Sequence, residues 1–276
     1  MNGRLVWMAG VLLTSNAWLC ASDAEWQRAV DAGDKARTEG KWDKAETAYF
    51  TAMQQAETFP EKDLRRQQTI NLLASATYAR GKMDDTEALY LQAIEWSTKV
   101  NGPEHPTTIY GIESLGWLLN QSNTTAKAMV AEKKYRHALA LREKLGGVDS
   151  PERYRALFGL IEALRIQKKF EDALPLAEQS VVYWEKFLPP EHTDLSAFWI
   201  QLGQIKDGAG KADEAEALFR KALKSDEENF GENHPVVARD LTVLAASLRA
   251  RKKDSEAKDL EKRALSIEKK MDKREH

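Results

Sequence analysis

The chain has 276 residues, a length that could hold two ordinary domains. Its 41 basic and 43 acidic residues leave a net charge of −2, so composition does not favour nucleic acid or an anionic membrane as the main partner. Helical periodicity is uniform after the first 22 residues, which indicates one elongated array rather than several unrelated domains.

The first 22 residues differ from the rest. Arg4 precedes an apolar run at residues 5–13, which is followed by polar residues and then by the small Ala21 and Ser22. This order predicts a secretory signal peptide in residues 1–22, cleaved after Ser22, and export to the periplasm or secretion. A run of nine apolar residues is too short to span a bilayer as a helix, which takes about 20. An uncleaved amino-terminal anchor is an alternative.

Cys20 offers a third interpretation, lipid attachment as in a bacterial lipoprotein. In such leaders a small residue directly precedes the modified cysteine. Here the bulky Trp18 and Leu19 precede Cys20, so lipidation is the minor possibility. Because Cys20 is the only cysteine, a cleaved product would contain no disulfide and must hold its fold by helix packing.

Residues 23–276 read as paired amphipathic helices joined by tight turns. The expected pairs span 25–59, 64–101, 107–146, 151–188, 193–230 and 235–273. In the fifth pair Trp199, Leu202 and Lys206 share one face of the first helix because their spacing is i, i+3 and i+7. Neither helix of a pair could bury its apolar face alone, so the pairs are expected to stack on one another.

Small residues mark the second helix of every pair. They recur every 41 to 45 residues, at Ala45, Thr86, Ala131, Ala173, Ala215 and Ala257. Another small residue follows seven positions later, and an aromatic residue stands between the two at Tyr49, Tyr90, Tyr135 and Phe219. These spacings indicate a true repeat.

Two pairs depart from the pattern. In the third, the turn is drawn out over residues 120–125, which predicts a surface bulge, with a contact loop as the alternative. In the sixth, the second helix is heavily charged, as expected of a terminal repeat that must keep a polar outer face.

These residues resemble the tetratricopeptide repeat family. Its pattern can be read through Trp199, Leu202, Gly203, Gly210, Ala215, Phe219 and Ala222. The 42-residue period and the connectors at 102–106 and 231–235 are similar to the kinesin-light-chain branch of that family. The resemblance implies an all-α fold, a right-handed superhelical solenoid of about six helix-turn-helix repeats.

No pattern predicts catalysis, a metal or a cofactor. Residues 208–211 come nearest to a phosphate loop, but Ala212 replaces the Ser or Thr that would hold magnesium. His105, His192 and His234 lie in similar connectors of different repeats. Stacked helices are about 8 to 10 Å apart, whereas metal ligands lie about 2 Å from one ion, so these histidines cannot converge. We therefore expect neither an enzyme nor a small-molecule substrate.

The resemblance further implies that the first helices of successive repeats line a groove that binds peptide segments. Beside each buried stripe, a second one at i, i+4 and i+7 shares a helix face. The candidate groove residues are Asn71, Ser75, Tyr78, Glu113, Trp117, Asn120, Phe158, Glu162, Arg165 and Gln204. In kinesin-light-chain-like arrays, asparagine at the place of Asn71 is similar to residues that hold bound peptide.

The residue types fit that role. Amides such as Asn71 can pair with a peptide backbone, and Tyr78 and Trp117 offer large anchors. Glu162 and Arg165 are expected to be exposed. The alternative for Trp117 and Phe158 is packing against a neighbouring helix.

The sequence thus predicts an exported, non-catalytic adaptor that binds a protein or peptide partner. The alternative is a structural subunit that self-associates into a homo-oligomer or joins a larger assembly.

Overall fold

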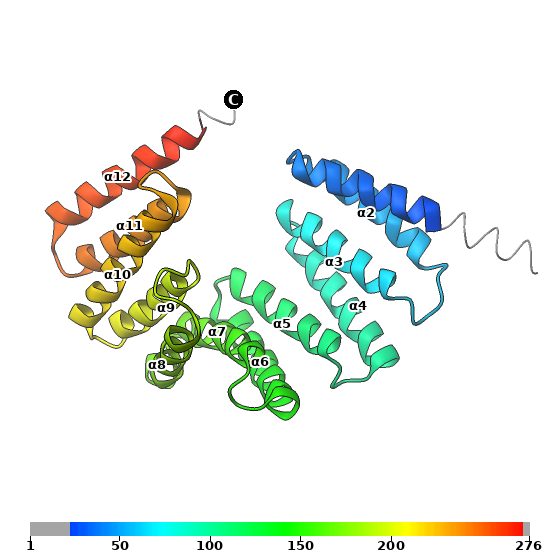
Figure 1. Cartoon of the computed structure of the whole chain (residues 1–276), viewed down its shortest axis with the longest axis horizontal. Coiled ribbons are helices and arrows are strands. Elements are labelled where there is room, and N and C mark those ends of the chain that lie inside the picture. The colour runs from blue at the N-terminus through cyan, green and yellow to red at the C-terminus, as the bar shows by residue number, and fades with distance from the viewer. Residues whose placement is uncertain (1–22, 273–276) are drawn as a thin grey trace, which may run out of the picture. The chain divides into compact units, whose positions relative to one another are not determined.

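The computed structural model describes residues 23–272, and all regular structure in this part of the chain is α-helical (Figure 1). The predicted signal peptide at 1–22 and the possible lipidation of Cys20 lie outside the described residues. Residues 23–38 are helical. The helices that follow are α2 (Trp42–Ala56), α3 (Leu64–Ala79), α4 (Met83–Asn101), α5 (Pro106–Gln121), α6 (Thr125–Gly146), α7 (Pro151–Ile166), α8 (Phe170–Phe187), α9 (Leu195–Gly208), α10 (Ala212–Phe230), α11 (Pro235–Ala250) and α12 (Asp254–Asp272).

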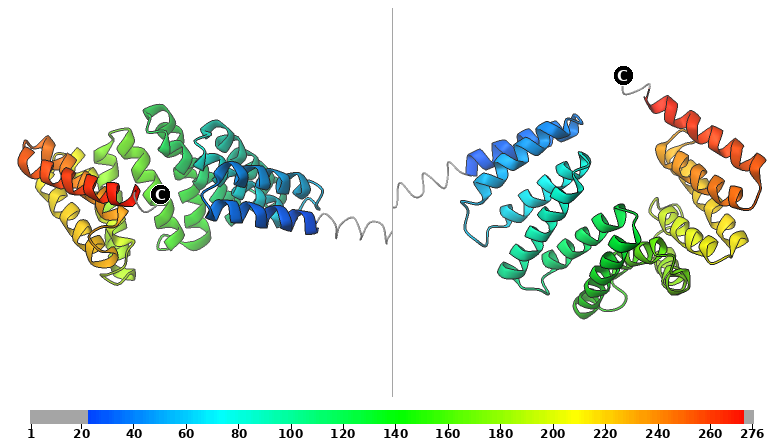
Figure 2. Two further views of the ribbon diagram at one scale, coloured as in Figure 1. Left: turned by 90° about the horizontal axis from the view of Figure 1, so that it is seen from above. Right: turned by 180° about the vertical axis from the view of Figure 1, so that it is seen from behind.

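The chain divides into two compact units, with the boundary between Leu118 and Leu119 inside α5. In the N-terminal unit α3 packs against both α2 and α4. In the C-terminal unit each helix from α6 to α12 packs against the next, and Figure 2 shows this succession of helix pairs from two further sides. The predicted all-α fold of helix-turn-helix repeats is confirmed.

The small residues of the second helices form the core of the repeats, as predicted. Ala45, Thr86, Ala131, Ala173, Ala215 and Ala257 are all fully buried. Phe219 fills the space beside them and packs on Gly203 of the paired helix. A Cβ atom at Gly203 would lie 2.5 Å from the Phe219 ring, so only glycine lets the helices approach this closely.

The turns inside the pairs use a left-handed residue. Gly40, Gly81 and Gly210 have φ between 69° and 79°. In the fourth and sixth pairs Lys168 and Lys252 adopt the same conformation, each with φ of 60°. Such a conformation is strained for a residue with a Cβ, so these two turns are formed at a local cost of about 1 kcal/mol.

The prediction of a drawn-out turn in the third pair is wrong. Helix α5 continues to Gln121 and α6 begins at Thr125, so only three residues connect them. The hydroxyl of Thr124 caps α6 by accepting a hydrogen bond from the backbone N–H of Lys127. Ala131 is the seventh residue of α6, whereas Ala215 is the fourth of α10. The three additional residues therefore add almost a full turn to the start of α6.

The aromatic residue of α6 packs on a glycine of the following pair. Tyr135 packs on Gly159 of α7, where a Cβ would lie 2.1 Å from the ring. Phe219 packs on Gly203 of its own pair and also lies in one buried cluster with Leu241 and Ala245 of α11. The contact between Tyr135 and Gly159 links the third pair to the fourth.

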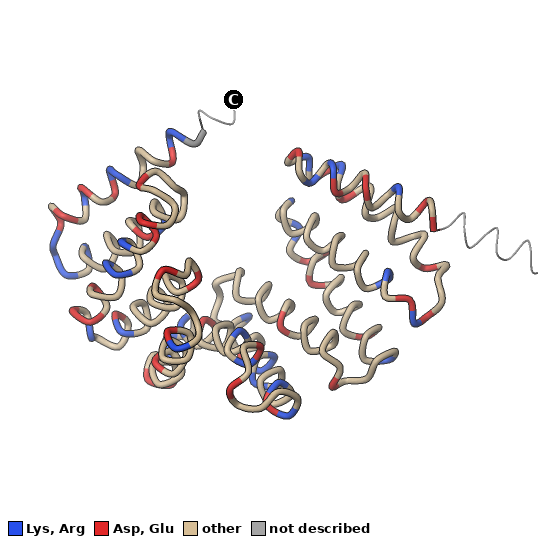
Figure 3. Tube along the Cα trace, in the orientation of Figure 1, with Lys and Arg blue, Asp and Glu red and all other residues tan. Residues whose placement is uncertain are grey.

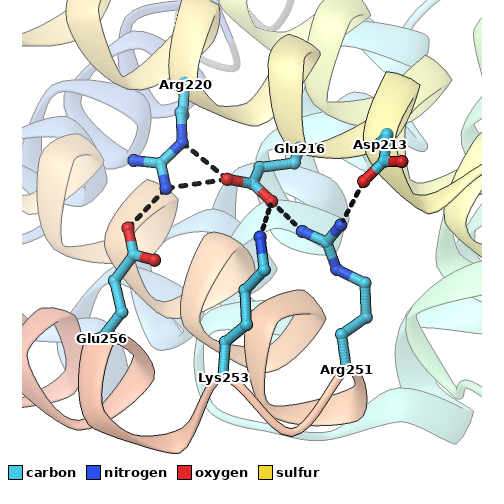
Figure 4. A network of polar contacts seen from close by, with 6 residues as sticks. All are labelled: Asp213, Glu216, Arg220, Arg251, Lys253 and Glu256. Atoms are coloured by element: carbon cyan, nitrogen blue, oxygen red, sulfur yellow. Dashed lines mark hydrogen bonds and ion pairs between the residues drawn. The ribbon is translucent and has the colours of Figure 1, made fainter.

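Ion pairs join successive repeats at three glutamates that follow the small core residue. Glu216 of α10 accepts hydrogen bonds from Arg220 on the same helix and from Arg251 and Lys253 in the next repeat (Figure 4). Glu46 binds Arg80 and Lys82 in the same way, and Glu132 binds Gln167 and Lys169. The turn of each following repeat thus holds the glutamate of the preceding one.

Charges of both signs are otherwise interspersed along the helices of each unit (Figure 3). No helix within residues 23–272 combines the length and the apolar character needed to cross a bilayer.

Candidate peptide-binding surfaces

Helices α3 and α5 place the candidate residues of the N-terminal unit. The buried face of α3 carries Ile70, Leu73 and Thr77. Beside it, Ser75 is exposed and Asn71 is half-buried. Helix geometry alone produces this split, because residues four apart share a face whereas adjacent residues are turned by about 100°.

Tyr78 and Trp117 form an aromatic pair that bridges α3 and α5. Their ring centroids are 4.7 Å apart with an interplanar angle of 57°. Trp117 nevertheless remains 40% exposed. The two interpretations of Trp117 are therefore compatible, because the ring packs on Tyr78 of a neighbouring helix while the side chain stays partly exposed. Glu113, one turn earlier on α5, is half-buried.

Two more tyrosines belong to this aromatic surface. Tyr110 lies seven residues before Trp117 on the same face of α5 and is 55% exposed. Burial, together with the nearby Tyr110 and Tyr78, raises the pKa of Tyr90 on α4. The sequence stripe missed Tyr110 because it started at Glu113. Counting back seven residues from Trp117 would have found it.

Asn120 is a correction to the predicted set. It is only 6% exposed, and its Nδ2 donates a hydrogen bond to the carbonyl oxygen of Gly159 at 3.0 Å. The end of α5 packs close to the backbone of α7 where Gly159 has no side chain, so the stripe passes from the surface into the core. Asn120 therefore joins helices rather than presenting an amide to a partner.

In the C-terminal unit, α7 and α9 place the remaining candidates. Phe158 is half-buried and packs edge-on against Phe198 of α9, with ring centroids 5.5 Å apart. Gln204 of α9 is half-buried. Phe158 thus contributes to helix packing while remaining partly exposed, as do the polar candidates of this surface.

Glu162 and Arg165 are half-buried and bind each other instead of standing free. The Arg165 Nε and Nη2 donate to the two carboxylate oxygens of Glu162 at 2.8 and 2.6 Å. This bond with Glu162 raises the pKa of Arg165. Glu162 takes two of the five N–H donors of Arg165, so the remaining donors could still bind an acceptor on a partner.

Within residues 23–272 no group of three or more His, Asp, Glu or Cys residues is placed to hold a metal ion. Cavities of about 300 and 350 Å³ lie elsewhere, the first beside Trp199 and Lys221 and the second beside Met53 and Trp96. The candidate residues line neither cavity. The surfaces are suited to non-covalent contact through amides, aromatic rings and one ion pair.

Comparison with known proteins identifies the repeats. Tetratricopeptide repeat family models match residues 67–107 and 194–270. No curated protein sequence matches the chain.

Solved structures agree on the fold. The kinesin light chain TPR-like repeats of Podosopora anserina superpose with a TM-score of 0.59 at 22% identity, covering 77% of this chain and 98% of that one. BtubC (BKLC) of P. vanneervenii superposes with a TM-score of 0.61 at 21% identity, covering 77% of this chain and 91% of that one. A Rap protein complexed with Competence and Sporulation Factor gives 0.57 at 15% identity, covering 91% and 78%. At these identities the likeness concerns the fold.

Proposed function

Because the chain is a tetratricopeptide repeat protein whose fold is of the kinesin-light-chain-like type, we propose that it is an exported, non-catalytic scaffold that binds a protein or peptide segment. The observation that carries the proposal is the exposed aromatic surface of α3 and α5, where a 40% exposed Trp117 lies against Tyr78. Trp and Tyr are enriched among the residues that dominate the energy of protein association. The Rap protein in complex with a factor is a protein of similar fold that binds a partner.

The chemistry of the surface narrows the partner. Asn71 and Ser75 lie on the same helix as Tyr78, and the Asn71 amide can both donate and accept a hydrogen bond. The Ser75 hydroxyl already donates to the carbonyl oxygen of Leu72, so it can accept one from a partner. The segment that fits has an apolar or aromatic side chain for Trp117 and a free backbone for Asn71.

A displayed library of random twelve-residue peptides, panned against the purified chain, tests this directly. Selected peptides should share an apolar or aromatic residue. The variant carrying Trp117→Ala and Asn71→Ala should bind them at least thirtyfold more weakly in fluorescence anisotropy, since an aromatic anchor contributes about 2 kcal/mol or more.

The matched control is Phe50→Ala on α2, because Phe50 is a 54% exposed aromatic residue outside the surface. It should leave binding unchanged. If the selected peptides bind the double variant as tightly as the wild type, the surface of α3 and α5 is not the binding site.

The proposal includes export and removal of residues 1–22, supported by the order of charge, apolar run and small residues in the sequence. Full-length protein made in a bacterial host should be recovered from the periplasmic fraction with Asp23 as its first residue, as read by intact mass. A mass increase that disappears in Cys20→Ser would instead show lipidation.

Self-assembly is the second candidate. It is favoured by exposed apolar residues where the α6–α7 connector meets the end of α8. Val148 is 60% and Phe187 is 56% exposed, and the Tyr183 hydroxyl beside Phe187 bonds the backbone oxygen of Asp149 at 3.1 Å. Sedimentation velocity should then reveal an oligomer that Phe187→Ser disperses and Trp117→Ala does not.

A further inference from the structure

Two carboxylates lie buried against each other between α10 and α11. Asp226 of α10 is fully buried and Asp240 of α11 is 1% exposed. Both oxygens of Asp226, and Oδ2 of Asp240, accept no hydrogen bond from the described residues. Leaving buried charged oxygens without a donor is strongly unfavourable, so the pair requires an explanation.

The countercharge is Arg239, the neighbour of Asp240 on α11. Its Nη2 lies 2.9 Å from Oδ1 of Asp240 and 3.7 Å from Oδ2 of Asp226. The Arg239 side chain is 53% exposed, so water weakens its attraction for both carboxylates. From α12, Arg263 pairs with Glu227 of α10 at 2.5 Å. One half-exposed guanidinium therefore faces two buried acids.

The preceding repeat fills this position with aromatic rings. The places 42 residues earlier hold Trp184 of α8 and Phe198 of α9. Those two rings stack with centroids 5.1 Å apart and an interplanar angle of 16°. Where one repeat interface is closed by aromatic packing, the next is closed by two acids.

Chemistry allows two carboxyl groups to fill a buried site if they share one proton. The protonated group then donates to the ionised one, and Arg239 balances the single remaining charge. Burial and the neighbouring carboxyl group of Asp226 raise the pKa of Asp240 to about 7, against the opposing effect of Arg239. The proton is therefore held well above the range in which an ordinary aspartate ionises.

We propose that Asp226 and Asp240 form a proton-dependent latch that holds the last repeat, α11 and α12, on α10. With the shared proton present, the two acids are joined by a hydrogen bond across the interface. When it is lost, two buried negative charges face each other and the last repeat loosens. The latch regulates the end of the array and is independent of the peptide-binding surfaces.

The direction of the pH effect follows from linkage. A group whose pKa is raised on folding stabilises the fold fully below its unfolded pKa of about 3.9, and this contribution is lost as pH rises towards the folded value. The last repeat is therefore held most firmly in acid and loosens up to about pH 7. Above that pH the effect is constant, because both states are ionised.

The Asp240→Asn variant tests the latch, because the amide is a permanent donor to Asp226 in the place of the shared proton. Amide hydrogen exchange of the whole chain is compared between variant and wild type at each pH, which cancels the intrinsic pH dependence of exchange. For α11 and α12, the ratio of wild-type to variant exchange should rise between pH 5 and pH 7, approaching tenfold per unit. The ratio for α3 and α4 should stay constant.

Asp259→Asn on α12 is the matched control, because Asp259 is an exposed acid on the same repeat. It should exchange like the wild type at every pH. A ratio for Asp240→Asn that does not change with pH would overturn the proposal. If Asp240→Asn does not fold, the carboxyl ¹³C chemical shifts of Asp226 and Asp240 in the wild type are followed against pH. A latch requires one titration step near neutral pH. Two titration steps below pH 5 would exclude it.

Discussion

Tyr78 and Trp117 are 39 residues apart in sequence, yet their rings pack 4.7 Å apart and join α3 to α5. The contact makes Trp117 both a packing residue and an exposed one. The two roles can be separated because an aromatic pair contributes about 1 kcal/mol to stability, whereas an anchor in a binding surface contributes more.

Substituting Trp117 with alanine should therefore lower the free energy of unfolding by about 1–2 kcal/mol and reduce binding of the selected peptides more than thirtyfold. Urea unfolding followed by circular dichroism gives the first quantity and anisotropy the second. Tyr78→Ala should cost similar stability with a smaller loss of binding. Equal binding losses for the two variants would mean that the pair acts only through packing.

Gly203→Ala should destabilise the fifth repeat. The added Cβ would lie 2.5 Å from the fully packed Phe219 ring, and the resulting strain of about 1–3 kcal/mol exceeds what alanine gains over glycine in a helix. In a Phe219→Leu background the ring is absent, so the same substitution should become neutral or stabilising. Thermal unfolding of the four proteins of this cycle measures the coupling.

Lys168→Gly and Lys252→Gly should each stabilise the chain by about 0.5–1 kcal/mol, because both positions have a φ of 60° that glycine adopts without strain. Both lysines are exposed and neither substitution removes a buried contact. The reverse change, Gly81→Lys, should destabilise by a similar amount. The midpoint of urea unfolding of each variant is compared with that of the wild type. Midpoints below the wild-type value for both lysine variants would contradict the strain at these two turns.

Glu132 and Glu216 should make the chain sensitive to acid. Burial raises the pKa of Glu216, but hydrogen bonds from Lys253, Arg220 and Arg251 outweigh it and lower the pKa to about 2. Lys169, Arg136 and Gln167 do the same for Glu132.

A lowered carboxylate pKa contributes stability that is present above about pH 4.5 and is lost as pH falls towards 2. The midpoint of urea unfolding should therefore fall over that range. Glu216→Gln should be less stable than the wild type at pH 6 and equal to it near pH 2. A difference that is the same at both values would show that the charge of Glu216 is not involved. This loss of stability in acid is opposite in sign to the pH effect expected of Asp240. The two effects can be separated because they act on different helices.

The sequence was sufficient to predict the helix pairs, because small and aromatic residues at fixed intervals are what close helix packing requires. Ala45 and Ala215 are fully buried as their spacing indicated. The fate of the third turn could not be predicted, since three extra residues can lengthen a loop or a helix equally well. Only the cap at Thr124 and the helical propensity of the following alanines favour the helix.

The candidate surfaces were harder to predict than the core. A stripe at i, i+4 and i+7 gives a direction on one helix but not the position of the next helix. Asn120 is buried by the backbone of α7, and Arg165 is paired with Glu162, for reasons that depend on contacts between residues. The shared proton of Asp226 and Asp240 was equally inaccessible, because each residue alone resembles a solvated charge.

The contact between Tyr135 and Gly159 has a consequence for protein engineering. Repeat arrays are often shortened, extended or recombined by exchanging segments that begin and end with one helix pair. In this chain a graft covering 107–146 would separate Tyr135 from the glycine that admits its ring. A graft that keeps α6 and α7 together, Thr125 to Ile166, would contain both Tyr135 and Gly159. Such a graft should fold within a foreign array far more readily.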